Sequence, residues 1–144
     1  MSVEPYDEVG IAGPDLIIRR IDPEQHVVDD DNRNCRRIST KAYSPSSGEN
    51  GGMSVDIEQL MIADDVEPKA YVTSPKYVGS VAFTAQSLRD VGLRIGYDPI
   101  PNVNPYHGEV WGTEVKPSRF TGAQRNAILS SASWYVQILG VELV

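Results

Sequence analysis

The segment from Cys35 to Tyr43 concentrates basic and hydroxyl side chains that could bind an anion. It contains Arg37, Ser39 and Thr40 in a chain whose formal net charge is -7. Arginine binds carboxylate and phosphate groups through a planar pair of N–H donors, and hydroxyl groups add hydrogen bonds. These residue types predict one wall of a site for an anionic ligand. The alternative is that they form the solvent-facing side of a sheet.

A second pair of cations, Arg19 and Arg20, ends an apolar segment earlier in the chain. If that segment pairs with the basic one, the two arginines would reach the same ligand as the hydroxyl groups. The alternative is that Arg19 or Arg20 faces solvent and pairs with a nearby acid such as Asp22 or Glu24, an arrangement that contributes little energy.

The third candidate is a histidine and a glutamate at a spacing of two. His107 follows a proline-rich loop and Glu109 comes two residues later. Strand side chains alternate between faces, so both are expected on one face of a strand. Histidine titrates near neutral pH, which predicts a catalytic acid–base role for the pair. The alternative is a histidine that is hydrogen-bonded at a strand edge. His26, the other histidine, follows an acidic turn and is expected to be solvated.

No cofactor and no metal ion are expected from the residue patterns. The glycines between Gly48 and Gly52 lack the Lys-Ser/Thr ending of a phosphate loop. The chain has no Cys/His grouping of the kind that binds zinc. The acidic run from Asp29 to Asp31 lacks the spacing of a calcium loop.

Short β-branched or alternating segments separated by Gly, Pro, Asn and Asp are expected to position these residues. The predicted strands are 16–21, 35–43, 53–57, 77–83, 93–97, 107–112 and 134–141. Helices are expected near 56–63, after the N-cap Thr84, and after Thr121, which begins a capping-box pattern. The prediction is an α+β fold with a largely antiparallel sheet and two or three short helices. Residues 1–15 are expected to be a flexible lead-in that orders only if it docks, and 16–144 a single globular domain.

Composition limits the function classes. At 144 residues the chain fits one domain. The acidic balance argues against nucleic-acid binding and against adhesion to an anionic membrane. One cysteine, Cys35, excludes an internal disulfide, and no apolar run approaches the length of a membrane span. The first residues lack a signal-peptide pattern, so a cytoplasmic location is expected.

Four segments in order resemble a family of small uncharacterised bacterial proteins. The segments are Ile18-Arg19-Arg20-Ile21, Arg37-Ile38-Ser39-Thr40-Lys41-Ala42-Tyr43, Met53-Ser54-Val55 and Pro105-Tyr106-His107-Gly108-Glu109-Val110-Trp111-Gly112. The family pattern is Arg-Arg-Ile, Arg-x-Ser-Ser-x-x-Phe, Met-Ser-Val and Pro-Ala-His-Ala. This chain departs from it at Thr40, Tyr43 and Gly108. The resemblance covers about residues 16–112 and implies a bacterial, cytosolic origin without assigning an activity.

A shorter likeness is to ADP-ribosyltransferases, which carry an arginine on an early strand, a Ser-Thr-Ser strand next and a late glutamate. Arg19 or Arg20, Ser39-Thr40 and Glu109 follow that order, with Lys41 in place of the third serine. This likeness implies a nucleotide-like substrate.

Two hypotheses follow. The first is a cytosolic binding or accessory protein that acts through a protein partner, in a bacterial defence or toxin-related operon; the acidic charge would steer it towards a basic partner. The alternative is a small enzyme on a nucleotide-like anionic substrate. For the alternative, Arg19 or Arg20, Ser39 and His107 must converge in one cleft.

Overall fold

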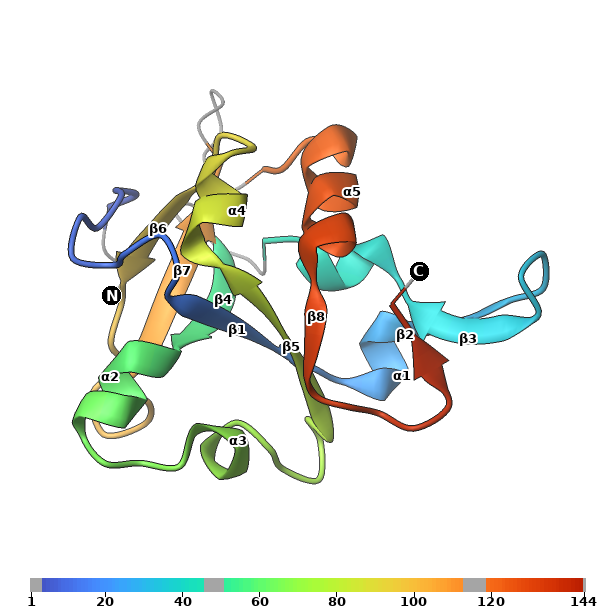
Figure 1. Cartoon of the computed structure of the whole chain (residues 1–144), viewed down its shortest axis with the longest axis horizontal. Coiled ribbons are helices and arrows are strands. Elements are labelled where there is room, and N and C mark those ends of the chain that lie inside the picture. The colour runs from blue at the N-terminus through green and yellow to red at the C-terminus, as the bar shows by residue number, and fades with distance from the viewer. Residues whose placement is uncertain (1–3, 46–50, 113–118, 144) are drawn as a thin grey trace.

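The computed structural model describes residues 4–45, 51–112 and 119–143. The main sheet of these residues has six strands in the order β6-β7-β4-β1-β5-β8 (Figure 1). Their bounds are β1 Leu16–Ile21, β4 Met53–Ile57, β5 Gly79–Thr84, β6 Arg94–Tyr97, β7 His107–Trp111 and β8 Ser133–Val136. Every neighbouring pair in this sheet is antiparallel. The α+β class with a largely antiparallel sheet is therefore confirmed.

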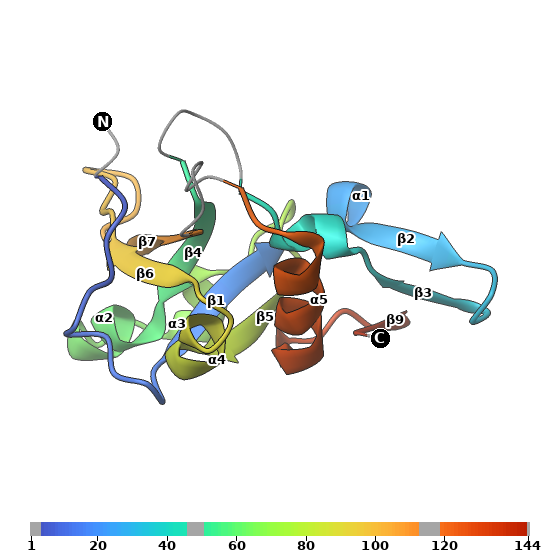
Figure 2. The ribbon, with the colours of Figure 1, turned by 90° about the horizontal axis from the view of Figure 1, so that it is seen from above.

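A smaller sheet combines a hairpin with the end of the chain. Its strands are β2 Val27–Asp30, β3 Cys35–Ile38 and β9 Val141–Glu142. The β2–β3 hairpin extends away from the main sheet (Figure 2). Most of the predicted basic segment lies in this hairpin or at its base.

Short helices connect the strands. In the described residues they are α1 Pro23–His26, α2 Glu58–Ala63, α3 Pro68–Tyr71, α4 Ala85–Arg89, α5 Gly122–Ser131 and the 3-10 helix η1 Thr40–Tyr43. The helices α2, α4 and α5 were predicted, and the capping box at Thr121 is present in both directions, at 3.0 and 2.9 Å. The single turns α1 and α3 were not predicted, because four residues are too few for a periodic pattern. No helix in the described ranges combines the length and the apolar character needed to cross a membrane.

The strand predicted over 35–43 ends early, at Ile38. The Ser39 hydroxyl accepts a hydrogen bond from the Lys41 N–H at 3.2 Å, and η1 begins at Thr40. Serine at an N-cap satisfies a backbone donor that a helical turn leaves free, so this local bond favours a turn over further strand.

Strand β1 separates two apolar clusters. Ile17 and Ile21 belong to the main core, whereas Ile18 packs with Met61 and Val72 in a second cluster. Because strand side chains alternate, Arg19 starts on the face of the main core and Arg20 on the face of the second cluster.

Residues 4–15 lie against β6, β7 and α4. The Tyr6 ring contacts Trp111 with ring centroids 5.9 Å apart. Asp7 accepts a hydrogen bond from Arg89 at 3.1 Å, and Ile11 is only 1% exposed. In this structure the described part of the lead-in is docked on the domain.

Candidate functional site

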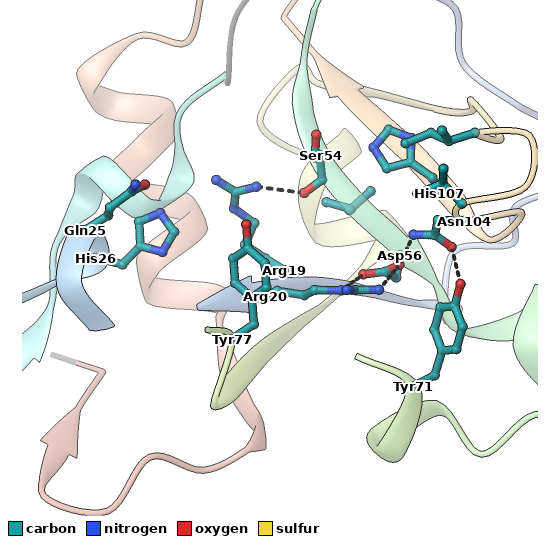
Figure 3. A pocket seen from close by; sticks show the side chains of 13 residues that line it. Arg19, Arg20, Gln25, His26, Ser54, Asp56, Tyr71, Tyr77, Asn104 and His107 are labelled. Carbon is teal, nitrogen blue, oxygen red and sulfur yellow. Dashed lines mark hydrogen bonds and ion pairs between the residues drawn. The ribbon is translucent and has the colours of Figure 1, made fainter. Parts of the chain in front are cut away.

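A cavity of about 580 Å³ opens between β1, β4, β7 and α1 (Figure 3). Strands β1 and β4 pair only at Ile17–Ile57 and Ile18–Asp56. Beyond these pairs the ladder stops, so the side chains of both faces of β1 can enter the space between the strands. The cavity is lined by Arg19, Arg20, Gln25, His26, Ser54, Val55, Asp56, Tyr71, Tyr77, Ile100, Val103, Asn104 and His107.

Arg19 spans the gap where the two strands diverge. Its Nε donates to the Ala42 carbonyl and its Nη1 to the Ser54 carbonyl, both at 2.9 Å. In the described part of the chain, Nη2 has no hydrogen-bond partner and the guanidinium has no carboxylate ion pair. Burial lowers the pKa of Arg19 from its usual value, but a guanidinium stays protonated at neutral pH. One edge of a fixed cation is therefore left for a ligand.

Arg20, in contrast, forms a two-point ion pair with Asp56. Its Nε and Nη2 donate to the two carboxylate oxygens at 2.8 and 3.1 Å. Asn104 donates a further bond to Asp56 at 2.7 Å and accepts one from the Tyr71 hydroxyl at 3.1 Å. The Arg20 guanidinium also lies 5.6 Å from the centroid of the Tyr71 ring. Arg20 does not pair with Asp22 or Glu24, and its charge is balanced within the wall of the cavity.

His26 lines the cavity and is 8% exposed, so the prediction that it is solvated was wrong. Its Nδ1 accepts a hydrogen bond from the Asp22 N–H at 2.9 Å, which leaves the proton of the neutral ring on Nε2. Burial, with smaller contributions from Arg19 and Lys76, lowers its pKa to about 4 against the opposing effect of Asp22. At neutral pH His26 is an uncharged hydrogen-bond donor.

His107 lines the cavity, and Glu109 lies beside it on the same face of β7, as the alternation predicted. His107 Nε2 is 3.9 Å from Glu109 Oε1, too far for a direct hydrogen bond. Glu109 Oε2 accepts from the Gly52 N–H at 3.0 Å. Burial and the nearby Asp98 raise the pKa of Glu109 to about 7, although Gly52 and Arg19 act in the opposite direction.

The predicted hydroxyl residues lie outside the cavity lining. Ser39 caps η1 and donates its N–H to the His26 carbonyl at 2.8 Å. Thr40 is the first residue of η1, the helix that supplies the Ala42 carbonyl to Arg19. Thus Ser39 and Thr40 belong to the structure that supports the cavity rather than to its surface.

Arg37 also lies outside the cavity lining. It pairs with Asp30 across the β2–β3 hairpin at 2.7 Å. The structure therefore brings together Arg19, Arg20 and His107, places Glu109 directly beside His107, and leaves Arg37 apart.

Several residues of the site were not singled out from the sequence. Asp56, Asn104 and Tyr71 form the network around Arg20. The sequence did carry a signal for Asp56, because a carboxylate between two apolar residues of a strand, Val55 and Ile57, is unusual. Asn104 and Tyr71 gave no signal, because their contacts span 33 and 48 residues of sequence.

Comparisons with protein-family models, with curated proteins and with solved structures found no match to this chain.

Proposed function

We propose that the protein binds a small, nucleotide-like organic anion in the cavity between β1, β4, β7 and α1. The observation that carries this proposal is the free edge of Arg19. Arg19 is half-buried without a carboxylate partner among the described residues, and two carbonyl acceptors replace only part of the hydration that its cation loses. A carboxylate or phosphate oxygen at Nη2 would supply both the missing hydrogen bond and the opposite charge.

The wall next to Arg19 supports an anion rather than a cation. His26 offers a neutral Nε2–H from α1, and Lys76 is close enough to lower the pKa of His26. The opposite wall carries Asp56, which forms an ion pair with Arg20. The positive charge of Arg19 is therefore not cancelled by the residues that line the cavity.

The size and lining of the cavity favour a ligand with a ring as well as a charged group. A volume of about 580 Å³ lies within the usual range for small-molecule sites. Tyr71 and Tyr77 contribute aromatic surface, and Val55, Ile100 and Val103 contribute apolar surface. A nucleotide combines a planar ring with phosphate groups. The ring would contact the aromatic and apolar surface, and a phosphate would bind Arg19.

Isothermal titration calorimetry with NAD, ATP, AMP and inorganic phosphate tests the proposal. Gln25 is an exposed residue of α1 that lines the cavity, so Gln25→Glu adds a negative charge without disturbing the core. It should weaken anion binding by about tenfold, since one like charge nearby costs roughly 1 to 2 kcal/mol. Gln137→Glu is the matched control, because Gln137 is exposed and does not line the cavity.

A second variant removes the anchor itself. Arg19→Gln keeps a donor but loses the charge, and should weaken binding by about 10- to 100-fold. Circular dichroism establishes that each variant is folded. Absence of binding to all four ligands, or equal weakening by Gln25→Glu and Gln137→Glu, would overturn the proposal.

The other expectations stay predictions. The prediction of a protein partner, in a defence or toxin-related operon, is based on the acidic charge of the chain. The prediction of a cytoplasmic location is based on the sequence of its first residues. Turnover of the bound anion, with His107 and Glu109 as the acid–base pair, would be detected as product formation by chromatography of the titrated mixtures.

A further inference from the structure

Three buried side chains with metal-binding atoms meet on one face of the β6–β7 pair. Asp98 follows β6, and His107 and Glu109 lie on β7. One ligand atom of each lies within 4.8 Å of those of the other two. The three residues are only 7 to 8% exposed. The register of the strands explains the meeting, because Glu109 lies opposite Gly96, whose side of β6 also carries Asp98.

The hydrogen bond of His107 fixes which ring nitrogen is available. Its Nδ1 lies 2.7 Å from the backbone carbonyl of Asp98. A carbonyl only accepts, so Nδ1 carries the proton and the Nε2 of the neutral ring keeps a lone pair. Metal-binding histidines are commonly oriented by such a bond to a backbone carbonyl. The free nitrogen faces Glu109 Oε1.

The two carboxylates also present free oxygens. The Gly52 N–H donates a hydrogen bond to Glu109 Oε2, and Glu109 Oε1 lies on the side of His107. The Asp98 carboxylate has neither a hydrogen bond nor an ion pair with any residue in the described ranges, although Asp98 is only 7% exposed. Water can still reach its oxygens, since they are not among the fully enclosed atoms that lack a partner; even so, a carboxylate that has no protein partner in the described ranges and lies within 4.8 Å of two other ligand atoms leaves a position that a cation can fill.

We propose that Asp98, His107 and Glu109 bind one divalent transition-metal ion through a carboxylate oxygen, Nε2 and Oε1. One imidazole and two carboxylates form a ligand set suited to Zn²⁺ or Mn²⁺, and the imidazole disfavours Mg²⁺ and Ca²⁺. A 2+ ion also neutralises two adjacent buried carboxylates.

The geometry needs a small contraction. Ligands bonded at about 2.1 Å in a tetrahedron lie about 3.4 Å apart. The ligand atoms lie within 4.8 Å of one another, and His107 Nε2 is 3.9 Å from Glu109 Oε1, so each pair must close by at most about 1.4 Å, which side-chain rotation can supply. Three protein ligands leave a fourth position for water or a ligand group. The metal site shares His107 with the lining of the cavity but does not include Arg19, and metal binding would take His107 and Glu109 out of the predicted acid–base role. The inference does not depend on anion binding at Arg19.

Titration of the chelator-treated, dialysed protein at pH 7.5 with ZnCl₂ and MnCl₂ tests the inference by calorimetry. We expect one Zn²⁺ or Mn²⁺ per chain and a higher melting temperature, with no comparable effect of MgCl₂ or CaCl₂. Addition of CoCl₂ should give visible absorption bands of a low-symmetry Co²⁺ site. Asp98→Asn, His107→Ala and Glu109→Gln should each weaken binding by at least about 100-fold, since loss of even an outer partner costs about 10- to 100-fold.

Two control variants address other metal-binding groups. Asp30→Asn changes an acid of the β2–β3 hairpin, and Cys35→Ser removes the thiol. Both should bind Zn²⁺ like the wild type. The inference is overturned if the folded wild type binds none of Zn²⁺, Mn²⁺ and Co²⁺, or if stoichiometric binding survives Asp98→Asn and Glu109→Gln. These two variants preserve side-chain shape, so the test stands even if His107→Ala fails to fold.

Discussion

Arg20 and Asp56 form a two-point ion pair across the β1–β4 gap, with N–O distances of 2.8 and 3.1 Å. Asp56 is 3% exposed, so the pair is largely shielded on the carboxylate side. Since Arg20 takes the charge of Asp56, Arg19 is left as the cation of the cavity without a carboxylate partner in the described residues. Asp56 therefore decides that Arg20 forms the ion pair and that Arg19 is the arginine available to a ligand.

Removal of this carboxylate should destabilise the fold. Asp56→Ala takes away the acceptor of the bonds from Arg20 and Asn104 and leaves their donors unsatisfied. The free energy of unfolding in urea is expected to fall by about 2 to 4 kcal/mol. Asp29→Ala is the control, since Asp29 is exposed and its ion pair with Arg36 is long, at 3.7 Å; its effect should stay below about 0.5 kcal/mol. Equal effects of the two substitutions would contradict the role of Asp56.

His26 should make the protein less stable in mild acid. Its pKa is about 4 in the fold against 6.5 for an unperturbed histidine, so the unfolded chain binds a proton in this range before the native state does. The contribution is complete above pH 6.5 and is lost as the pH falls towards 4, by about 2 to 3 kcal/mol. Chemical denaturation of the wild type and His26→Asn at pH 7 and pH 4.5 measures it, because Asn retains an acceptor for the Asp22 N–H. A free-energy difference between the two proteins that is the same at both pH values would refute it.

Glu109 should have the opposite pH dependence. Its pKa is about 7 in the fold against 4.5 normally, so the native state holds the proton more tightly and stability is lost as the pH rises from 4.5 to 7. With a chelator present, Glu109→Gln should be more stable than the wild type at pH 8 by about 1 to 2 kcal/mol, and close to it at pH 5. Glu24→Gln, at an exposed position of α1, should show no such dependence. The prediction fails if Glu109→Gln is no more stable than the wild type at pH 8.

Gly108 should not tolerate a side chain. A Cβ at this position would lie 2.8 Å from the Gly96 carbonyl oxygen and 2.8 Å from Ile57 Cδ1. Gly108→Ala is therefore expected to cost about 1 to 3 kcal/mol of stability, which thermal and urea unfolding would detect. Gly122→Ala is the matched control: a Cβ there meets nothing within 4 Å at the start of α5, so stability should be unchanged or slightly higher. A neutral Gly108→Ala would show that β6, β7 and β4 separate more readily than this packing implies.

Local patterns in the sequence determined the class of the fold and several parts of the site. The apolar segment of β1 and the capping box at Thr121 depend on residues close in sequence, so both were predicted. The same holds for His107 and Glu109, whose common face follows from the two-residue period of any strand. The strand predicted to continue through Ser39 was wrong because one side-chain hydrogen bond favours a turn there.

Tertiary structure decided which of these residues meet. Alternation alone places Arg19 and Arg20 on opposite faces, and they line one cavity only because β1 and β4 diverge after Ile18–Asp56. Asp98 reaches His107 and Glu109 through the register of β6 with β7. Strand divergence and strand order result from packing between segments far apart in the chain, and no local period of the sequence encodes them.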